Sequence, residues 1–310
     1  MTAATATHEL VLTGLDGGNP LGFLAALGTL RSVALARPDA RPLMSWRFGG
    51  AWRPVLRSPF PDAKALAVGL FDKLKHYSQA LEVSDDPGIP AGLYREKALK
   101  FRTRRSEDAN LLAALASDGA AATNSKKKAV CQDTAFRTMG GQGHQHMLQF
   151  ARNICAACTA GHLERALFQI WCYDDPVENH TLRWDPVDDV RYALRWRNPS
   201  GDPARKSRGS VCGANRLAIE ALPLLPCIPQ GTKVRTVGFL QMRHEGVLFR
   251  WPIWQTPLSL DGVRTLLTLR WSASDDARHR ELLERGVVAQ FASRRVNVNR
   301  FRNFTPAKPV

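Results

Sequence analysis

The segment at residues 20–30 constrains the fold most, because it is apolar almost all the way round a helix. It reads Pro-Leu-Gly-Phe-Leu-Ala-Ala-Leu-Gly-Thr-Leu. A helix without a polar face has to be buried on every side. Pro20 suits the first helical position, and Asn19 before it is a candidate N-cap. Gly22 and Gly28 indicate that a neighbouring backbone approaches closely. We therefore expect a fully buried helix here.

Hydrophobic periodicity predicts strands and helices along the rest of the chain. Strands are expected at residues 9–13, 236–240 and 247–254, with a hairpin of 44–48 and 51–56, and helices at 63–79, 147–160, 163–170, 213–221, 259–269 and 276–285. These elements interleave without regular βαβ spacing. We therefore expect an α+β fold, an irregular mixed sheet with helices and not a regular doubly wound fold. An N-terminal α/β part, 1–130, and a C-terminal α+β part, 131–310, could pack as one domain.

The chain is strongly basic, and the excess positive charge is concentrated at its C-terminal end. Its 310 residues include 43 Lys and Arg against 28 Asp and Glu, a formal charge of +15. From Arg205 onward there are 18 Lys and Arg and 7 acidic residues, a net +11. Such a field attracts polyanions. Solubility alone would not require the charge to gather at one end.

The last residues, from Ser293 to Val310, form a basic tail that mixes arginines with aromatic and amide side chains and has no acidic residue. Cations neutralise phosphates, and flat rings and guanidinium planes stack on unpaired bases. The nucleic-acid contacts expected in this tail are Arg294, Arg295, Asn297, Asn299, Arg300, Phe301, Arg302 and Phe304. The same alternation also suits an edge strand whose arginines prevent unwanted pairing.

Two further basic segments lie in the first half of the chain. One is a cluster on a strand or loop that leads into a helix near residues 109–116, and its members are Lys97, Lys100, Arg102, Arg104 and Arg105. The other closes a low-complexity stretch at 117–128, for which we expect a mobile surface loop, and consists of Lys126, Lys127 and Lys128. A lysine run can equally be a solvated surface.

The residues typical of catalysis or metal binding are few. There is no P-loop, no G-x-G-x-x-G, no H-E-x-x-H and no G-x-S-x-G. Asp185, Asp188 and Asp189 could form a Mg²⁺ cluster, but their turn-rich context favours turn formation and surface pairing. His144 and His146 with Cys155 and Cys158 supply half of a zinc motif. Cys155 and Cys158 also fit one apolar helix face as small buried hydrophobes. We therefore predict no catalytic residue, metal or cofactor.

A glycine-rich turn at residues 140–143 offers unblocked backbone N–H groups ahead of a helix. Such groups suit an anion or a phosphate, and Gln142 could contact a base edge or a phosphate there. A tight turn is the alternative interpretation.

The six cysteines are too few for a disulfide scaffold in a chain of 310 residues. No signal peptide opens the sequence, and no apolar run approaches the roughly 20 residues that span a bilayer. We expect a cytoplasmic protein with reduced thiols and no membrane partner.

Several phrases together resemble one known family. They are TGLDGGNPLGFLAALG at 13–28, WDPVDDVRYALRW at 184–196, GANRLAIEALP at 213–223, WPIW at 251–254 and RNFTP at 302–306. They are similar to a protein of type I-G (formerly I-U) CRISPR operons, described as a Cas large-subunit-type protein or helicase-associated extension. The matches span nearly the whole chain, and none is a catalytic signature.

The resemblance implies a Cascade-like, crRNA-guided DNA surveillance complex in antiviral defence. In such complexes base pairing supplies sequence specificity, while protein subunits read a short flanking motif (PAM) and hold the strands. The implied partners are crRNA, target DNA and the other type I-G Cas subunits: a backbone subunit, a fused processing-and-tail subunit and the helicase-nuclease. The large subunit generally helps to recruit that helicase-nuclease.

Two other functions compete with non-catalytic nucleic-acid binding. A protein adaptor would dock the helicase-nuclease or another subunit without touching DNA, with Trp184, Trp196, Trp251 and Trp254 as interface anchors. Aromatic residues beside proline turns usually bury, so the core is the alternative place for these tryptophans. A metal-dependent nuclease would use the aspartates or the His and Cys residues.

Overall fold

The computed structural model describes residues 7–123, 128–140, 145–173, 175, 181–188, 210–242, 246–269, 276–298 and 301–310. Its central element is helix α1 (Pro20–Ala36). The side chain of Asn19 caps the helix by accepting from the N–H groups of Leu21 at 2.8 Å and Gly22 at 3.2 Å. Every residue from Pro20 to Val33 is buried. The predicted buried helix, with its cap, is confirmed.

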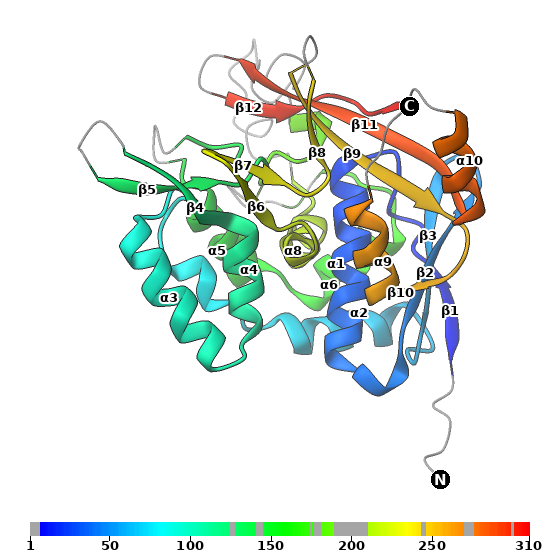
Figure 1. Ribbon diagram of the computed structural model, residues 1–310. Coiled ribbons are helices and arrows are strands. Elements are labelled where there is room, and N and C mark those ends of the chain that lie inside the picture. The colour runs from blue at the N-terminus through cyan, green and yellow to red at the C-terminus, as the bar shows by residue number, and fades with distance from the viewer. Residues whose placement is uncertain are drawn as a thin grey trace, which may run out of the picture.

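An antiparallel sheet lies on one side of α1, at the right in Figure 1. It contains β1 (His8–Val11), β3 (Trp52–Ser58), β2 (Leu43–Phe48) and β10 (Leu258–Ser259), in that order. β2 and β3 form the predicted hairpin, and Gly50 in its turn has a φ of 75°, which favours glycine. β10 joins this sheet from far along the chain, so the sheet connects the two sequence parts on either side of residue 130.

A second, longer antiparallel sheet crosses the top of the molecule in Figure 1. Its order is β12 (Phe301–Phe304), β11 (Val287–Val298), β9 (Gly246–Trp254) and β8 (Phe239–Met242), and β13 (Lys308–Pro309) also pairs with β11. β11 therefore lies between two strands and is not the edge strand that the arginine alternation suggested. The basic tail is a β-hairpin.

Helix α8 (Cys212–Ala221) packs against α1 in the centre of the fold. A Cβ added at Gly28 of α1 would lie 1.8 Å from the carbonyl oxygen of Leu217, so only glycine allows this approach. Around the pair lie α2 (Ala63–Leu74), α5 (Met147–Ala157) and α6 (Ala160–Phe168). The close backbone contact predicted at Gly28 is confirmed.

The remaining elements surround this centre. Helices α3 (Ala91–Thr103) and α4 (Glu107–Leu115) lie at the lower left in Figure 1, below the hairpins β4 (Ala116–Thr123) with β5 (Ala129–Asp133) and β6 (Cys227–Gln230) with β7 (Lys233–Thr236). Helices α9 (Leu260–Thr268) and α10 (Asp276–Glu284) precede β11. Short 3₁₀ turns occupy Pro38–Ala40, Gln79–Glu82, Pro186–Asp188 and Leu222–Leu224.

One continuous hydrophobic core runs through residues from both sides of position 130. Trp184, Trp251 and Trp254 are 0 % exposed within it, so they are core residues and cannot anchor a partner. Trp196 lies outside the described residues. Several antiparallel sheets with helices around them confirm the predicted irregular α+β class. In the part of the chain that the structure describes, no helix is long and apolar enough to cross a membrane.

Candidate nucleic-acid interface

The first basic cluster lies on a helix and not on the strand or loop that the sequence suggested. Lys97, Lys100 and Arg102 belong to α3, Arg104 is its C-cap, and Arg105 follows. Cations at this end interact favourably with the partial negative charge of the helix C-terminus. Arg105 takes a left-handed conformation with φ 50°, and its N–H bonds to the carbonyl of Arg102 at 2.9 Å. The chain thereby turns sharply into α4.

Four of these cations are exposed and have no ion pair with any described residue; we name them the α3 cationic turn: Lys100, Arg102, Arg104 and Arg105. Lys97 is instead half-buried, and its Nζ lies 3.0 Å from Oε1 of its neighbour Glu96.

The carboxylates nearest in sequence to the α3 cationic turn are engaged elsewhere. Glu107 Oε2 is 2.6 Å from Nη2 of the buried Arg31, while the Glu107 side chain itself is 48 % exposed. Burial opposes ionisation of Glu107, but hydrogen bonds from Asn110 and Arg31 outweigh it and hold the pKa of Glu107 below its usual value. Asp108 accepts from the hydroxyls of Ser78 and Ser106, each at 2.6 Å. Neither acid neutralises the turn.

Many other arginines of this chain do have carboxylate partners. Arg47 reaches Glu9, Arg95 reaches Asp118, Arg152 reaches Asp85 and Arg165 reaches Asp175, at 2.6 to 2.8 Å. The unneutralised α3 cationic turn contrasts with these pairs. It therefore presents a local positive field to which a polyanion can bind.

The C-terminal hairpin β11–β12 carries the second group of predicted contacts. Arg294 and Asn297 are exposed, and Arg302 is partly buried opposite Asn297. Arg295 is half-buried, and its Nη1 donates to the carbonyl of Ala135 at 2.7 Å. Burial, with the nearby charge of Arg302, lowers the pKa of Arg295 to about 10, so the side chain stays charged at neutral pH. Figure 1 places this hairpin at the top, far from the end of α3.

Phe304 is a correction. It is 1 % exposed, and its ring packs 6.2 Å from the rings of Phe239 and Phe249. A ring buried in the core cannot stack on a base. The cause is tertiary packing: both Asn303 and Phe304 of β12 are buried, and the Phe304 ring is part of an aromatic cluster in the core. For Phe301 the structure describes the backbone in β12 but not the side chain.

The low-complexity stretch 117–128 is a further correction, because its described residues as far as Thr123 belong to strand β4 and not to a loop. β4 and β5 form an antiparallel hairpin whose register shifts between Ser117 and Ala122. Lys128 is exposed where β5 begins. The other expected contacts, Lys126, Lys127, Gln142, Asn299 and Arg300, lie outside the described residues.

The structure gives Asp185 a structural role. It is 3 % exposed; Oδ1 accepts from the N–H of Val187 at 3.0 Å and from Asn19 Nδ2 at 3.2 Å, and Oδ2 accepts from the Tyr173 hydroxyl at 3.0 Å. These bonds fix the turn to the start of α1. Asp189 lies outside the described residues.

The half zinc motif is not assembled among the described residues. Cys155 and Cys158 are buried, as the hydrophobic interpretation expects, and His146 Nδ1 bonds to Asp86 Oδ2 at 2.7 Å. His144 lies outside the described residues, and within them no three His, Cys, Asp or Glu side chains are placed to hold a metal.

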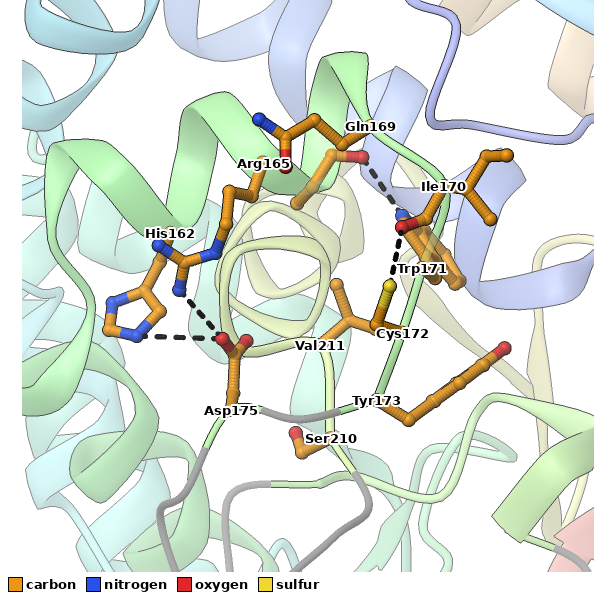
Figure 2. Close-up of a pocket in the computed structure, with 11 residues that line it drawn as sticks. His162, Arg165, Gln169, Ile170, Trp171, Cys172, Tyr173, Asp175, Ser210 and Val211 are labelled. Carbon is orange, nitrogen blue, oxygen red and sulfur yellow. Dashed lines mark hydrogen bonds and ion pairs between the residues drawn. The ribbon is translucent and has the colours of Figure 1, made fainter.

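A small pocket between α6 and α8 gathers polar side chains around Asp175 (Figure 2). Arg165 Nη2 lies 2.8 Å and His162 Nε2 3.7 Å from Asp175 Oδ1, and the N–H of Cys212 donates to Oδ2 at 2.6 Å. Its volume is about 70 Å³, well below the roughly 300 Å³ at which small-molecule sites begin. The network holds α6 to the start of α8 and leaves no room for a nucleobase.

A buried ionic cluster at the helix pair was not predicted from the sequence. Glu220 Oε2 is 2.7 Å from Arg31 Nη1, and Glu220 Oε1 is 2.8 Å from Arg216 Nη1. Arg216 and Glu220 are four residues apart on one helix, a spacing from which their ion pair could have been predicted. Arg31 is 189 residues from Glu220, and nothing in the sequence links them. Because Arg31 also contacts Glu107 of α4, this cluster connects α1, α4 and α8.

Comparisons with protein-family models, with curated proteins and with solved structures found no match.

Proposed function

We propose that this protein binds nucleic acid without breaking bonds in it, as a large-subunit-like component of a type I-G CRISPR surveillance complex. One observation carries the binding proposal: the α3 cationic turn is exposed and its neighbouring acids are engaged elsewhere. The complex itself is proposed from the sequence resemblance.

The α3 cationic turn would neutralise phosphates of a bound strand. Each phosphate contact releases condensed counterions, so the logarithm of affinity falls with the logarithm of salt by about 0.9 per contact on duplex DNA. Exposed arginine and lysine side chains of this kind position a strand without reading its bases. Sequence would be read by crRNA pairing, and the protein would hold DNA at the flanking motif.

The C-terminal hairpin would supply a second, separate contact through Arg294, Asn297 and Arg302. Because it lies far from the α3 cationic turn, the two surfaces suit different stretches of nucleic acid. Crosslinking of the assembled complex would show which strand each surface touches.

Charge reversal of the α3 cationic turn tests the proposal. The complex of crRNA with the type I-G subunits is assembled with Arg102→Glu and Arg104→Glu, and target-DNA affinity is measured across a salt series. The matched control is Lys64→Glu with Lys73→Glu, two exposed lysines of α2 that give the same change in net charge.

The α3 variant is expected to lower the salt slope by about 1 to 2, and the control to leave it near wild type. If both variants shift affinity equally, the effect is one of net charge alone and the α3 cationic turn is not a contact.

A further inference from the structure

The outer edge of β8 carries backbone groups that no other described strand pairs with. β8 ends the order β12-β11-β9-β8. The N–H of Arg250 donates to the carbonyl of Gly238 at 2.8 Å. Hydrogen-bonded and non-hydrogen-bonded pairs alternate along an antiparallel ladder, so the N–H and C=O groups of Phe239 and Gln241 point away from β9. An edge of this kind is a template for another strand.

An apolar groove runs directly beside this open edge. It measures about 340 Å³, which is within the size range of binding sites. Its apolar lining comes from β6, from β8 and the residues before it, and from the end of α9, and includes Ile228, Val237, Phe239, Leu240, Leu267 and Leu269. Ile228 is 48 % exposed, so an aliphatic side chain placed in the groove would cover apolar surface now open to water.

A cation stands at the same groove. Arg235 of β7 is exposed, lines the groove and has no ion pair with any described residue. Lys233, two residues earlier on the same strand, is exposed as well and is likewise unpaired in the described part of the chain. The groove therefore suits an occupant that brings a carboxylate.

We propose that the edge of β8 accepts an extended, acidic segment of a partner protein, which adds to the sheet as a further strand. Its backbone would pair with Phe239 and Gln241, an aliphatic side chain would enter the groove, and a carboxylate would meet Arg235. Backbone pairing supplies affinity in this mode of recognition, and the side-chain contacts supply specificity. This protein-docking edge is additional to the nucleic-acid contacts and does not depend on them.

Other occupants satisfy these groups less well. A DNA backbone offers acceptors but no N–H donors, so it would leave the outward carbonyls of β8 unpaired. A second copy of this chain pairing through β8 would bring no carboxylate to Arg235, since β8 itself carries no acidic residue. An acidic peptide strand meets all three requirements.

Peptide binding to the full chain tests the proposal. The probe is a fluorescein-labelled synthetic peptide, Glu-Thr-Val-Thr-Val-Thr-Glu, whose valines and glutamates share one face when extended. Two matched probes carry N-methyl groups on the central backbone, or Lys in place of Glu. Fluorescence anisotropy is expected to show binding of the first peptide and at least about tenfold weaker binding of the other two. N-methylation removes backbone hydrogen bonds, and Lys would meet Arg235 with a like charge.

Two protein variants locate the binding site. Gln241→Pro removes an outward N–H while leaving the β8–β9 ladder intact, which an edge strand tolerates, and should weaken peptide binding about tenfold. Gln241→Ala keeps the N–H and should bind as wild type. Arg235→Glu should reverse the preference, so that the Lys peptide binds better than the Glu peptide.

Several results would overturn the proposal. They are equal affinity for the N-methylated peptide, or no binding of any peptide at millimolar concentration. Self-association in sedimentation that Gln241→Pro abolishes would assign the edge to a second copy. Displacement of the peptide by a single-stranded oligonucleotide would assign it to nucleic acid.

Discussion

The Cα of Gly28 in α1 faces the backbone carbonyl of Leu217 in α8, and a Cβ placed there would lie 1.8 Å from that oxygen. The two central helices therefore touch backbone to backbone. Because the oxygen belongs to a helix backbone that is itself packed on α6, it cannot move aside as the end of a flexible side chain would. The glycine sets the distance between the helices on which the rest of the core is built.

Gly28→Ala is expected to destabilise the fold by about 3 kcal/mol, because the added methyl group forces α1 and α8 apart. The matched control is Gly92→Ala in α3, where nothing lies within 4 Å of an added Cβ. There alanine should stabilise by about 0.5 to 1 kcal/mol, as it does in exposed helices. Urea denaturation measures both. Equal effects of the two variants would contradict the close approach.

Glu220→Gln should destabilise the fold by about 3–5 kcal/mol, because it leaves the buried Arg216 without a compensating charge and Arg31 with Glu107 alone. Arg31 and Arg216 are 3 % and 1 % exposed in their pairs with Glu220. Glu281→Gln is the control: Glu281 and Arg285 form the same four-residue spacing with both side chains about half exposed. That loss should stay below about 1 kcal/mol.

The same cluster predicts an acid-sensitive stability. Burial opposes ionisation of Glu220, but Arg216 and Arg31 outweigh it and hold the pKa of Glu220 below its ordinary value of 4.5. A carboxyl whose pKa is lowered on folding stabilises the native state above its unfolded pKa, and this contribution is lost as pH falls through the folded value. The free energy of unfolding should therefore decline below pH 4.5, and less steeply in Glu220→Gln. Parallel pH profiles would refute this.

Phe304→Ala should cost about 3–5 kcal/mol, as expected for a fully buried ring. Phe48→Ala, whose ring is 61 % exposed, should change stability by less than about 1 kcal/mol. Thermal denaturation followed by circular dichroism distinguishes the two. A stable Phe304→Ala variant with impaired nucleic-acid binding would contradict the burial of this ring and support a stacking role for Phe304.

Thiol labelling of the native protein should modify Cys172 first, since it is exposed while the other five cysteines are buried. Burial raises the pKa of Cys155 to about 11 and that of Cys227 to about 12, so both stay protonated and unreactive near pH 8. Mass spectrometry after brief iodoacetamide treatment counts the labels. Rapid labelling of several sites would mean that the core opens.

Local signals were enough to predict the centre of the fold. Asn19 and Pro20 mark the start of α1, and the absence of a polar face requires its burial. Helix α3, which carries the first basic cluster, could also have been predicted from the sequence. Tyr94, Ala98 and Phe101 repeat at helical spacing and face the core. The cluster was instead predicted on a strand or loop, because only its charges were considered and this apolar stripe was not.

Other features could not be predicted because they depend on distant partners. The Ala- and Gly-rich stretch of β4 has low strand propensity, and only its pairing with β5 makes it a strand. Phe304 follows Arg302 and Asn303 in a basic segment, and whether its ring is buried depends on Phe136, Phe239 and Phe249. The α3 cationic turn and the cations of the C-terminal hairpin also lie far apart in the fold, and the order of residues along the chain does not show this separation.

The bond from Arg31 to Glu107 has a further consequence for the α3 cationic turn. Glu107 lies two residues after Arg105, and Arg31 attaches it to the central helices. The backbone that carries the cations is therefore held in place before any ligand arrives. A nucleic-acid strand that binds there meets a preorganised surface, so binding costs little conformational entropy of the protein backbone. The affinity should therefore be limited mainly by desolvation and by the ordering of four flexible side chains.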